Sequence, residues 1–249
     1  MQKAILVSGS DRYNTQMLYF TCSSLSADDR YLYMLSDRTG DPNVVVRDLA
    51  TGHETVLTDN REGYLKSYVY FDGRPYRGLG KASVCLDGRH NRLYYIQGDE
   101  IRTVGLDGKI RTLARLPQGQ MTAFTHVSGN GNWLCVPTTD ARCLDFDPQT
   151  EGTGLDRRPA YNIDERVQKE ELNSYLRVFD TRTGEQALCE PVRKAWVTHV
   201  QFHPLHSRMI LYNHEWASFD CGIRRMWLFD GKRHIRLRDE AHGAHRDDW

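Results

Sequence analysis

One short pattern recurs four times along the 249-residue chain: an apolar strand that ends in or near an Asp, followed by a tight Gly turn and a second strand. The turn glycines are Gly52, Gly108, Gly184 and Gly231, which are 56, 76 and 47 residues apart. The longest spacing contains a polar insertion, so the underlying period is about 50 residues. Hairpin signals at this period predict four-stranded antiparallel sheets around a common axis, and hence an all-β fold of the β-propeller type.

Each repeat is expected to supply about four short strands, because its apolar runs are brief and bounded by clusters of Asp, Gly and Asn. The first repeat gives Gln16–Ser23, Tyr31–Ser36, Val44–Asp48 and Glu54–Thr58, and the second gives Ala82–Leu86, Arg92–Ile96, Ile101–Val104 and Ile110–Ala114. The third gives Met121–Ser128, Trp133–Thr138, Arg142–Phe146, Tyr175–Asp180 and Ala187–Glu190, and the fourth gives Val197–His203, Met209–His214, Arg225–Phe229 and His234–Arg238.

The third repeat is interrupted by a polar insertion over Asp147–Asn173. Residues 162–172 are rich in helix-forming and charged side chains, which predicts one short helix within a loop laid over one face of the domain. A disordered surface insertion is the alternative, because a polar segment buries little apolar surface.

Residues 242–249 read like the opening of a fifth repeat. A propeller normally closes on itself, since closure removes the exposed edges of its sheets. We therefore expect residues 1–249 to form a single β-propeller domain that is incomplete at its C-terminus and belongs to a longer natural chain. A four- or five-bladed ring closed by Ala4–Val7 is the alternative.

The chain carries 33 Lys and Arg against 33 Asp and Glu, so its formal net charge is zero. Nucleic-acid-binding proteins usually show a basic excess, and this balance argues against such a partner. No apolar run approaches the length of a membrane span, and residues 1–7 are too short and too weakly apolar for a signal peptide. We expect a cytoplasmic location without membrane association, or a periplasmic one if a signal peptide has been removed. The six cysteines form no CxxC pair and are expected to be reduced.

The fourth repeat contains the densest group of polar and aromatic side chains. His199 lies in its first strand, and His214, Glu215 and Trp216 follow one another at the end of its second strand. A charged pair that ends a strand and precedes Trp favours the edge of a site. Two structural alternatives stay open, a hydrogen-bonded core position for His199 and an ion pair between Glu215 and a neighbouring Arg. A metal held by His199, His214 and Glu215 is compatible with the composition, although the spacing is unspecific.

Asp11 and Arg12 lie directly before the first strand. The entry to the first strand of a propeller blade faces the central channel, so we expect these side chains to approach the same cleft as His199. An ordinary N-terminal loop is the alternative.

Parts of the fourth repeat resemble the oligogalacturonate lyases. The matching stretches are Trp196–Pro204, Ile210–Glu215 and Arg225–Trp227. That family shows a His before a Pro turn, then a His-Glu-Gly motif, then Arg-Met-Trp or Arg-Ile-Trp before a strand. The first repeat also fits, and so does the charged insertion before the strand at 176–184. The likeness covers most of the chain in patches, and the sequence departs from it where Glu215 runs directly into Trp216.

The resemblance implies a seven-bladed propeller and a lyase that cleaves short, pectin-derived uronic acid chains by β-elimination, with an oligogalacturonate as the partner. Arg225 is carried over as the catalytic residue, and the expected substrate-binding residues are His199, His214, Glu215, Trp216, Asp11 and Arg12. The resemblance also implies a divalent metal, Mn or Ca, with ligands beyond residue 249, and a catalytic base that opens the fifth blade. It leaves the oligomeric state open.

The implied chemistry is physically consistent with an Arg in the site. Removal of the C5 proton of a uronate places extra negative charge on its carboxylate, and a cation must stabilise that charge. The planar fork of Arg suits a carboxylate, because it can donate two parallel hydrogen bonds. Two other readings stay open: a non-catalytic propeller that binds a protein or glycan, and a propeller lyase or hydrolase that acts on another uronic-acid polysaccharide.

Overall fold

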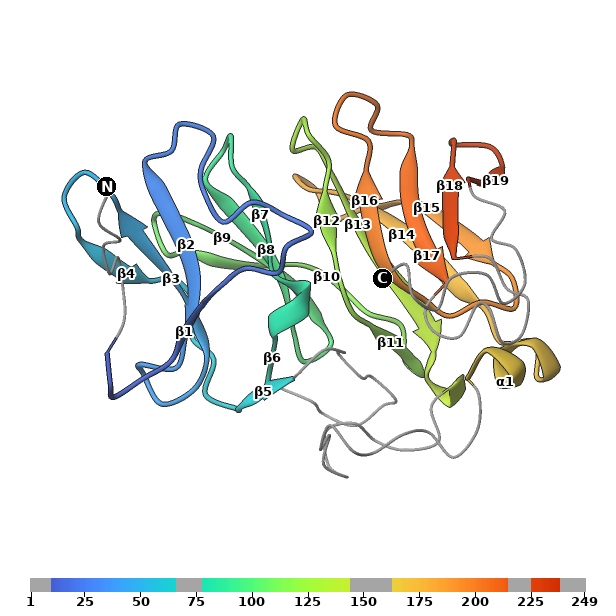
Figure 1. Ribbon diagram of the computed structural model, residues 1–249, viewed down its shortest axis with the longest axis horizontal. Coiled ribbons are helices and arrows are strands. Elements are labelled where there is room, and N and C mark those ends of the chain that lie inside the picture. The colour runs from blue at the N-terminus through green and yellow to red at the C-terminus, as the bar shows by residue number, and fades with distance from the viewer. Residues whose placement is uncertain (1–9, 66–77, 144–162, 215–224, 238–249) are drawn as a thin grey trace, which may run out of the picture.

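The computed structural model describes residues 10–65, 78–143, 163–214 and 225–237, and these residues form four sheets. The sheets follow one another in chain order, from the blue end of the ribbon to the red end (Figure 1). Strand pairing within them is antiparallel apart from the short parallel pair of β5 and β6. The expected all-β fold with blade-like sheets is therefore confirmed. The expected start of a fifth repeat lies outside the described residues.

In each sheet most successive strands pair with one another. The first contains β1 (Thr15–Met17), β2 (Tyr31–Ser36), β3 (Asn43–Asp48) and β4 (Glu54–Val56). The second contains β5 (Tyr64–Leu65), β6 (Leu79–Gly80), β7 (Cys85–Asp87), β8 (Arg92–Gln97), β9 (Glu100–Gly105) and β10 (Ile110–Arg115). The third contains β11 (Gln120–Thr122), β12 (His126–Val127), β13 (Trp133–Asp140), β14 (Ser174–Asp180) and β15 (Gln186–Val192). The fourth contains β16 (Val197–Phe202), β17 (Ile210–His214), β18 (Met226–Phe229) and β19 (His234–Arg236).

Four expected strands differ from the observed ones. The strand expected at Ala82–Leu86 is wrong at its start, because residues Lys81–Ser83 form a 3-10 turn and the strand begins only at Cys85. The run Gln16–Ser23 is a strand only as far as Met17, after which the chain turns away from the sheet. The run Met121–Ser128 divides into β11 and β12, which both pair with β13. The strand expected at Arg142–Phe146 is wrong at its start, because residues Ala141–Cys143 form a 3-10 turn, and residues 144–146 lie outside the described part of the chain.

The recurring Asp and Gly are explained by the turns that they build. The side chains of Asp48, Asp180 and Asp230 accept hydrogen bonds from the backbone N–H groups of Ala50, Arg182 and Lys232 at 2.9, 2.8 and 2.9 Å. Such bonds let a short polar side chain replace a backbone partner in a tight turn. Gly184 has a φ of +80°, and a Cβ added there would lie 2.0 Å from the carbonyl oxygen of Leu113. Glycine is therefore required at this turn for its conformation and for its close approach to the second sheet.

The core consists mainly of three apolar clusters, one between each pair of successive sheets. Strand β8 shows how the alternation of side chains produces this arrangement. Leu93 and Tyr95 pack toward the first sheet, while Tyr94 and Ile96 pack toward the third. Because successive residues of a strand point to opposite faces, a sheet covered on both sides needs apolar residues at every position.

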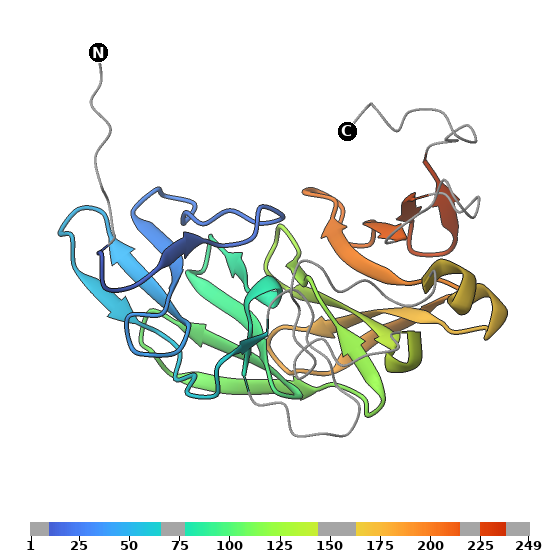
Figure 2. The ribbon, with the colours of Figure 1, turned by 60° about the horizontal axis from the view of Figure 1, so that its bottom comes forward.

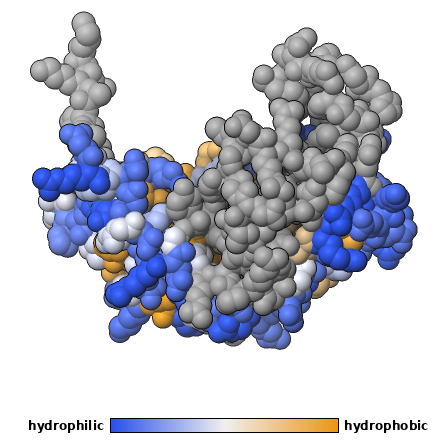
Figure 3. Space-filling view, turned by 90° about the horizontal axis from the view of Figure 1, so that it is seen from below, coloured by the Kyte–Doolittle hydropathy of each residue, from blue (hydrophilic) through white to orange (hydrophobic). Residues whose placement is uncertain are grey.

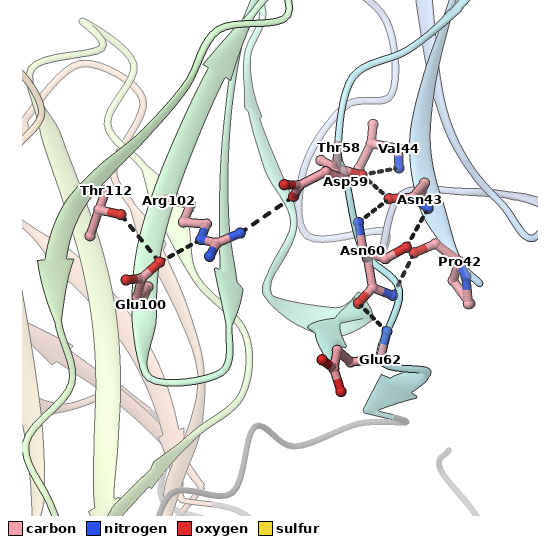
Figure 4. A network of polar contacts seen from close by, with 10 residues as sticks. All are labelled: Pro42, Asn43, Val44, Thr58, Asp59, Asn60, Glu62, Glu100, Arg102 and Thr112. Atoms are coloured by element: carbon pink, nitrogen blue, oxygen red, sulfur yellow. Dashed lines mark hydrogen bonds and ion pairs between the residues drawn. The ribbon is translucent and has the colours of Figure 1, made fainter. Parts of the chain in front are cut away.

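A buried polar network holds the chain where it leaves the first sheet for the second (Figure 4). The side-chain oxygen of Asn43 accepts hydrogen bonds from the hydroxyl of Thr58 and the N–H of Asn60, both at 2.7 Å. Between them in the chain, Asp59 reaches Arg102 of β9 at 3.4 Å. Residues 58–60, which connect the first sheet with the second, are thus held by polar contacts with both sheets.

The expected short helix is confirmed as α1 (Ile163–Lys169), within the range Asp147–Asn173. Val167 of α1 is buried against Trp196, which precedes the fourth sheet. Among the described residues, no helix combines the length and apolar character needed to cross a membrane. Seen from below, the described surface is mostly hydrophilic, with small separate apolar areas (Figure 3).

Candidate functional site

A cavity of about 450 Å³ lies between the fourth sheet and the segment that leaves β1. We call residues 18–22 the crossing segment, because they run from the first sheet toward the orange strands of the fourth (Figure 1, Figure 2). The described residues that line the cavity are Tyr19, Phe20, Thr21, His199, Val200, Gln201, Leu211, Tyr212, Asn213, Arg225 and Met226. Residues 180 positions apart in the sequence therefore form one site.

A bulge in β16 presents His199 to this cavity. The pairing of β16 with β17 shifts between Val197 and Val200, so that the residues between them leave the regular register. The side-chain oxygen of Asn213 accepts the backbone N–H of His199 at 2.9 Å and so satisfies the amide that the bulge releases. Bulges occur often at functional sites, because they redirect a side chain without ending the strand.

The imidazole of His199 is held on three sides. Its Nε2 lies 3.2 Å from the hydroxyl of Tyr19, and its Nδ1 lies 2.8 Å from the hydroxyl of Thr198. Its ring stacks on that of Phe124, with the ring centroids 4.0 Å apart and an angle of 17° between the planes. Because both ring nitrogens are engaged and one face is covered, the orientation of His199 is fixed by the surrounding side chains.

Among the described residues that line the cavity, Arg225 carries a positive charge, and it lies directly before β18. Its backbone carbonyl accepts the N–H of His214 at 3.0 Å, which extends the pairing of β17 with β18 by one step. Arg225 is half-buried and is one of the residues that line the cavity. A partly desolvated guanidinium binds a carboxylate more strongly than a fully hydrated one.

His214 does not join His199 and Arg225, and the expectation that it points into the same cleft is wrong. It follows Asn213 in β17, and its side chain lies on the opposite face of the strand. There its ring stacks on Trp227 at a centroid distance of 5.3 Å. Burial, with a smaller contribution from His234, lowers the pKa of His214 to about 4. His214 is therefore uncharged near neutral pH and packs between strands. It is absent from the described walls of the cavity.

The other expected site residues are not brought to the cavity. Asp11 and Arg12 are exposed, and they are absent from its described walls. The N–H of Arg12 bonds to Ser10, in a local turn before β1. The residues that leave β1, rather than those that enter it, are the ones that reach the site. Glu215 and Trp216 lie outside the described residues.

Sequence reasoning missed the aromatic part of the site. The rings of Tyr19 and Phe124 lie 4.3 Å apart, and Phe124 in turn stacks on His199. Both aromatic residues belong to runs that read as ordinary strands. The sequence offered one hint, the length of the apolar run Gln16–Ser23. Only Thr15–Met17 pair with β2, so the end of this run was available for contacts outside the first sheet.

The described residues do not include a metal centre. No group of three or more His, Cys, Asp or Glu side chains gathers within this part of the chain. In particular, His199 and His214 lie on different faces of the fourth sheet. The structure therefore does not support a metal held jointly by His199, His214 and Glu215. The described residues thus do not provide the ligands of a metal site.

Comparison with solved structures relates this fold to known propellers. An oligogalacturonate lyase in complex with manganese superposes with a TM-score of 0.70 at 18% sequence identity, over 92% of this chain and 55% of the lyase. The oligogalacturonate lyase of Vibrio parahaemolyticus gives a TM-score of 0.70 at 16% identity, over 95% of this chain and 56% of the lyase. A prolyl endopeptidase structure gives 0.52 at 11% identity, over 96% of this chain and 30% of the peptidase.

These comparisons establish a shared fold. The chain spans just over half the length of the two lyases. No family model matches the sequence. No curated protein matches it either.

Proposed function

We propose that the chain is a lyase-type propeller that binds a short uronic acid chain in the cavity between the fourth sheet and the crossing segment, and that it acts by β-elimination. The observation that carries this proposal is the meeting of His199 and Arg225 at one cavity. His199 lies in β16 and Arg225 lies directly before β18, and the sequence resemblance points to both residues. The shared fold with oligogalacturonate lyases supports the same reading.

In the proposed reaction, Arg225 binds the carboxylate of the sugar whose C5 proton is removed. The electron pair of the C5–H bond forms a double bond between C4 and C5, and the bond between C4 and the glycosidic oxygen breaks. The leaving oxygen takes up a proton, so the products are one chain with a new hydroxyl and one with a 4,5-unsaturated end. Arg225 stabilises the charge that grows on the carboxylate in the transition state.

His199 is assigned to binding and orientation rather than to proton abstraction. Its two ring nitrogens already contact Tyr19 and Thr198, so it would contact the sugar chain through its ring carbons and keep this wall of the cavity in a fixed orientation. The catalytic base is not assigned to a described residue. The resemblance implies a divalent metal and a catalytic base, and we propose that residues outside the described ranges supply both.

The test is incubation of the protein with saturated oligogalacturonates, with and without added Mn²⁺ or Ca²⁺, while the ultraviolet absorbance of the 4,5-unsaturated product is recorded. A rise in absorbance that requires Arg225 supports the proposal. Release of reducing ends without this absorbance would identify a hydrolase. Binding without any cleavage would identify a non-catalytic glycan-binding propeller, and absence of both binding and cleavage would reject the proposal.

A further inference from the structure

Strand β16, which carries His199, is held by the third sheet as well as by its own. In the fourth sheet it pairs with β17 along one edge, and on its other edge it lies beside β12 (Figure 1). There the N–H of Phe124 donates to the carbonyl of Thr198 at 3.3 Å. The N–H of Phe202 donates to Nδ1 of His126 at 3.2 Å. The third sheet therefore holds this edge of β16 on both sides of the bulge that presents His199.

His126 contacts the crossing segment with the same ring. The carbonyl of Thr21 accepts a hydrogen bond from the imidazole, and the side chain of Gln201 donates to this carbonyl at 3.4 Å. Because the N–H of Phe202 occupies the lone pair of Nδ1, the proton of the neutral ring is on Nε2, which is the nitrogen left to donate to Thr21. One imidazole thus joins three segments: β12 of the third sheet, β16 of the fourth and the crossing segment of the first.

The surroundings of His126 keep its ring neutral. Burial lowers the pKa of His126 to about 4, and the carbonyl of Thr21 opposes this effect only in part. A protonated ring carries a hydrogen on both nitrogens, so it could no longer accept the N–H of Phe202. The neutral tautomer with its proton on Nε2 is therefore the form that satisfies both contacts.

We infer that His126 is a positioning residue of the candidate site, which holds the two walls of the cavity together from behind. Thr21 belongs to the wall formed by the crossing segment and Gln201 to the wall formed by β16, whereas His126 is absent from the described lining. Without the imidazole, the crossing segment keeps its attachment near Ser24, but the contact of Thr21 with the third sheet is lost. The inference concerns the shape of the cavity, and only its kinetic consequence rests on the proposed function.

The test is amide hydrogen exchange of the 249-residue chain, followed by NMR at two reporter amides. The N–H of Phe202 reports on β16, and the N–H of Cys22, which donates to the carbonyl of Tyr19 at 3.1 Å, reports on the crossing segment. His126→Phe keeps a ring but removes both contacts, so both amides should exchange roughly tenfold faster.

Two further variants at His126 separate the two contacts. His126→Asn places an amide oxygen near the position of Nδ1 but is too short to reach Thr21, so only the Cys22 amide should exchange faster. His126→Gln places an amide nitrogen near the position of Nε2, so only the Phe202 amide should exchange faster. If His126→Phe does not fold in a thermal melt, this opposite pattern decides the inference.

His214→Phe is the matched control, because it replaces another buried histidine whose pKa is about 4 and which is absent from the described walls of the cavity. Both reporter amides should exchange in it as in the parent protein. The ring ¹⁵N spectrum of the parent should show His126 protonated on Nε2 and unprotonated on Nδ1 between about pH 5.5 and 8. The inference is overturned if His126→Phe leaves the Cys22 amide unchanged, if His214→Phe accelerates it equally, or if the ring proton is on Nδ1.

The kinetic consequence is measured with an oligogalacturonate as the substrate. His126→Phe should raise KM about tenfold and lower kcat less than about fivefold, because a loosened wall weakens the binding of ground state and transition state alike. An unchanged KM together with faster exchange of the Cys22 amide would overturn the positioning role. A parent protein that shows no β-elimination would reject the proposed reaction, while the exchange rates and the ring spectrum still decide whether His126 joins the two walls.

Discussion

The second and fourth sheets are built from the same repeat, but they use their middle strands differently. In β8 of the second sheet, Leu93 and Ile96 are both fully buried although they point to opposite faces. In β17 of the fourth sheet, Tyr212 is buried on one face, while Leu211 and Asn213 are half-buried on the other. Both faces of the second sheet pack against neighbouring sheets. In the fourth sheet one face packs in the core and the other forms part of the cavity wall. The same scaffold thus gives stability in one place and a candidate site in another.

The largest expected effect is on stability, and it separates the two sheets directly. Leu93→Ala should lower the free energy of unfolding by about 4 kcal/mol, because it leaves a hole in a core that is closed on both sides. Leu211→Ala should cost only about 1 kcal/mol, because its side chain already borders the cavity. Urea unfolding of both variants measures the difference, and equal costs would show that the fourth sheet is packed like the second.

A second prediction concerns turnover and rests on the proposed function. Arg225→Lys keeps the charge but loses the two-pronged hydrogen bonding, so it should raise the barrier by about 3 kcal/mol, or roughly a hundredfold in kcat. Its melting temperature should stay close to that of the parent protein. Arg233→Lys, in the same sheet but 78% exposed and paired with Asp230, is the control that should leave turnover unchanged. Normal turnover in Arg225→Lys, or equal losses in both variants, would contradict the assignment of Arg225.

The architecture was predictable from the sequence because its signals are local. Alternating apolar residues and the Asp and Gly turns placed most strands to within a few residues, including β2, β8 and β17. The path of the crossing segment was not predictable. Leu18, Tyr19 and Phe20 have the composition of a strand, but they leave the first sheet, and Tyr19 and Thr21 contact residues 180 positions away in the sequence.

The candidate site was predictable in part, for a related reason. His199 and Arg225 were recognised from short motifs, and both line the cavity. The face of each side chain depends on strand register, which a single bulge changes. The bulge between Val197 and Val200 is invisible in the sequence, and so is the assignment of Asn213 rather than His214 to the cavity.

A third prediction uses His214 to test the packed face of the fourth sheet. Burial lowers the pKa of His214 and of His126 to about 4, so in the acid range the unfolded chain binds more protons than the native protein. Stability should therefore fall as the pH drops from about 6.5 toward 4, and each His should contribute a loss of about 2 kcal/mol at pH 5 relative to pH 8.

His214→Phe keeps a ring against Trp227 and removes the titrating group together with its buried Nδ1, which has no hydrogen-bond partner among the described residues. It should remove about half of the acid destabilisation that the two histidines produce. Urea unfolding between pH 4.5 and 8 provides the measurement. An unchanged pH profile would mean that His214 is already accessible to protons in the native state.

The smallest expected effect concerns the contact that joins the first sheet to the cavity side of the fourth. Tyr19→Phe removes the hydroxyl that lies 3.2 Å from Nε2 of His199, and it leaves the ring packing on Phe124 in place. A lost hydrogen bond of this kind is worth about 1 kcal/mol, so turnover on an oligogalacturonate should fall about fivefold with little change in stability. Tyr31→Phe, in β2 of the first sheet and away from the cavity, should leave turnover unchanged. If Tyr19 acts by orienting His199, its substitution should have no further effect in a His199→Asn background, because the hydrogen-bond partner is already gone. An undiminished fivefold loss in that background would instead show that the hydroxyl of Tyr19 contacts the substrate directly, and that the crossing segment belongs to the binding surface in its own right.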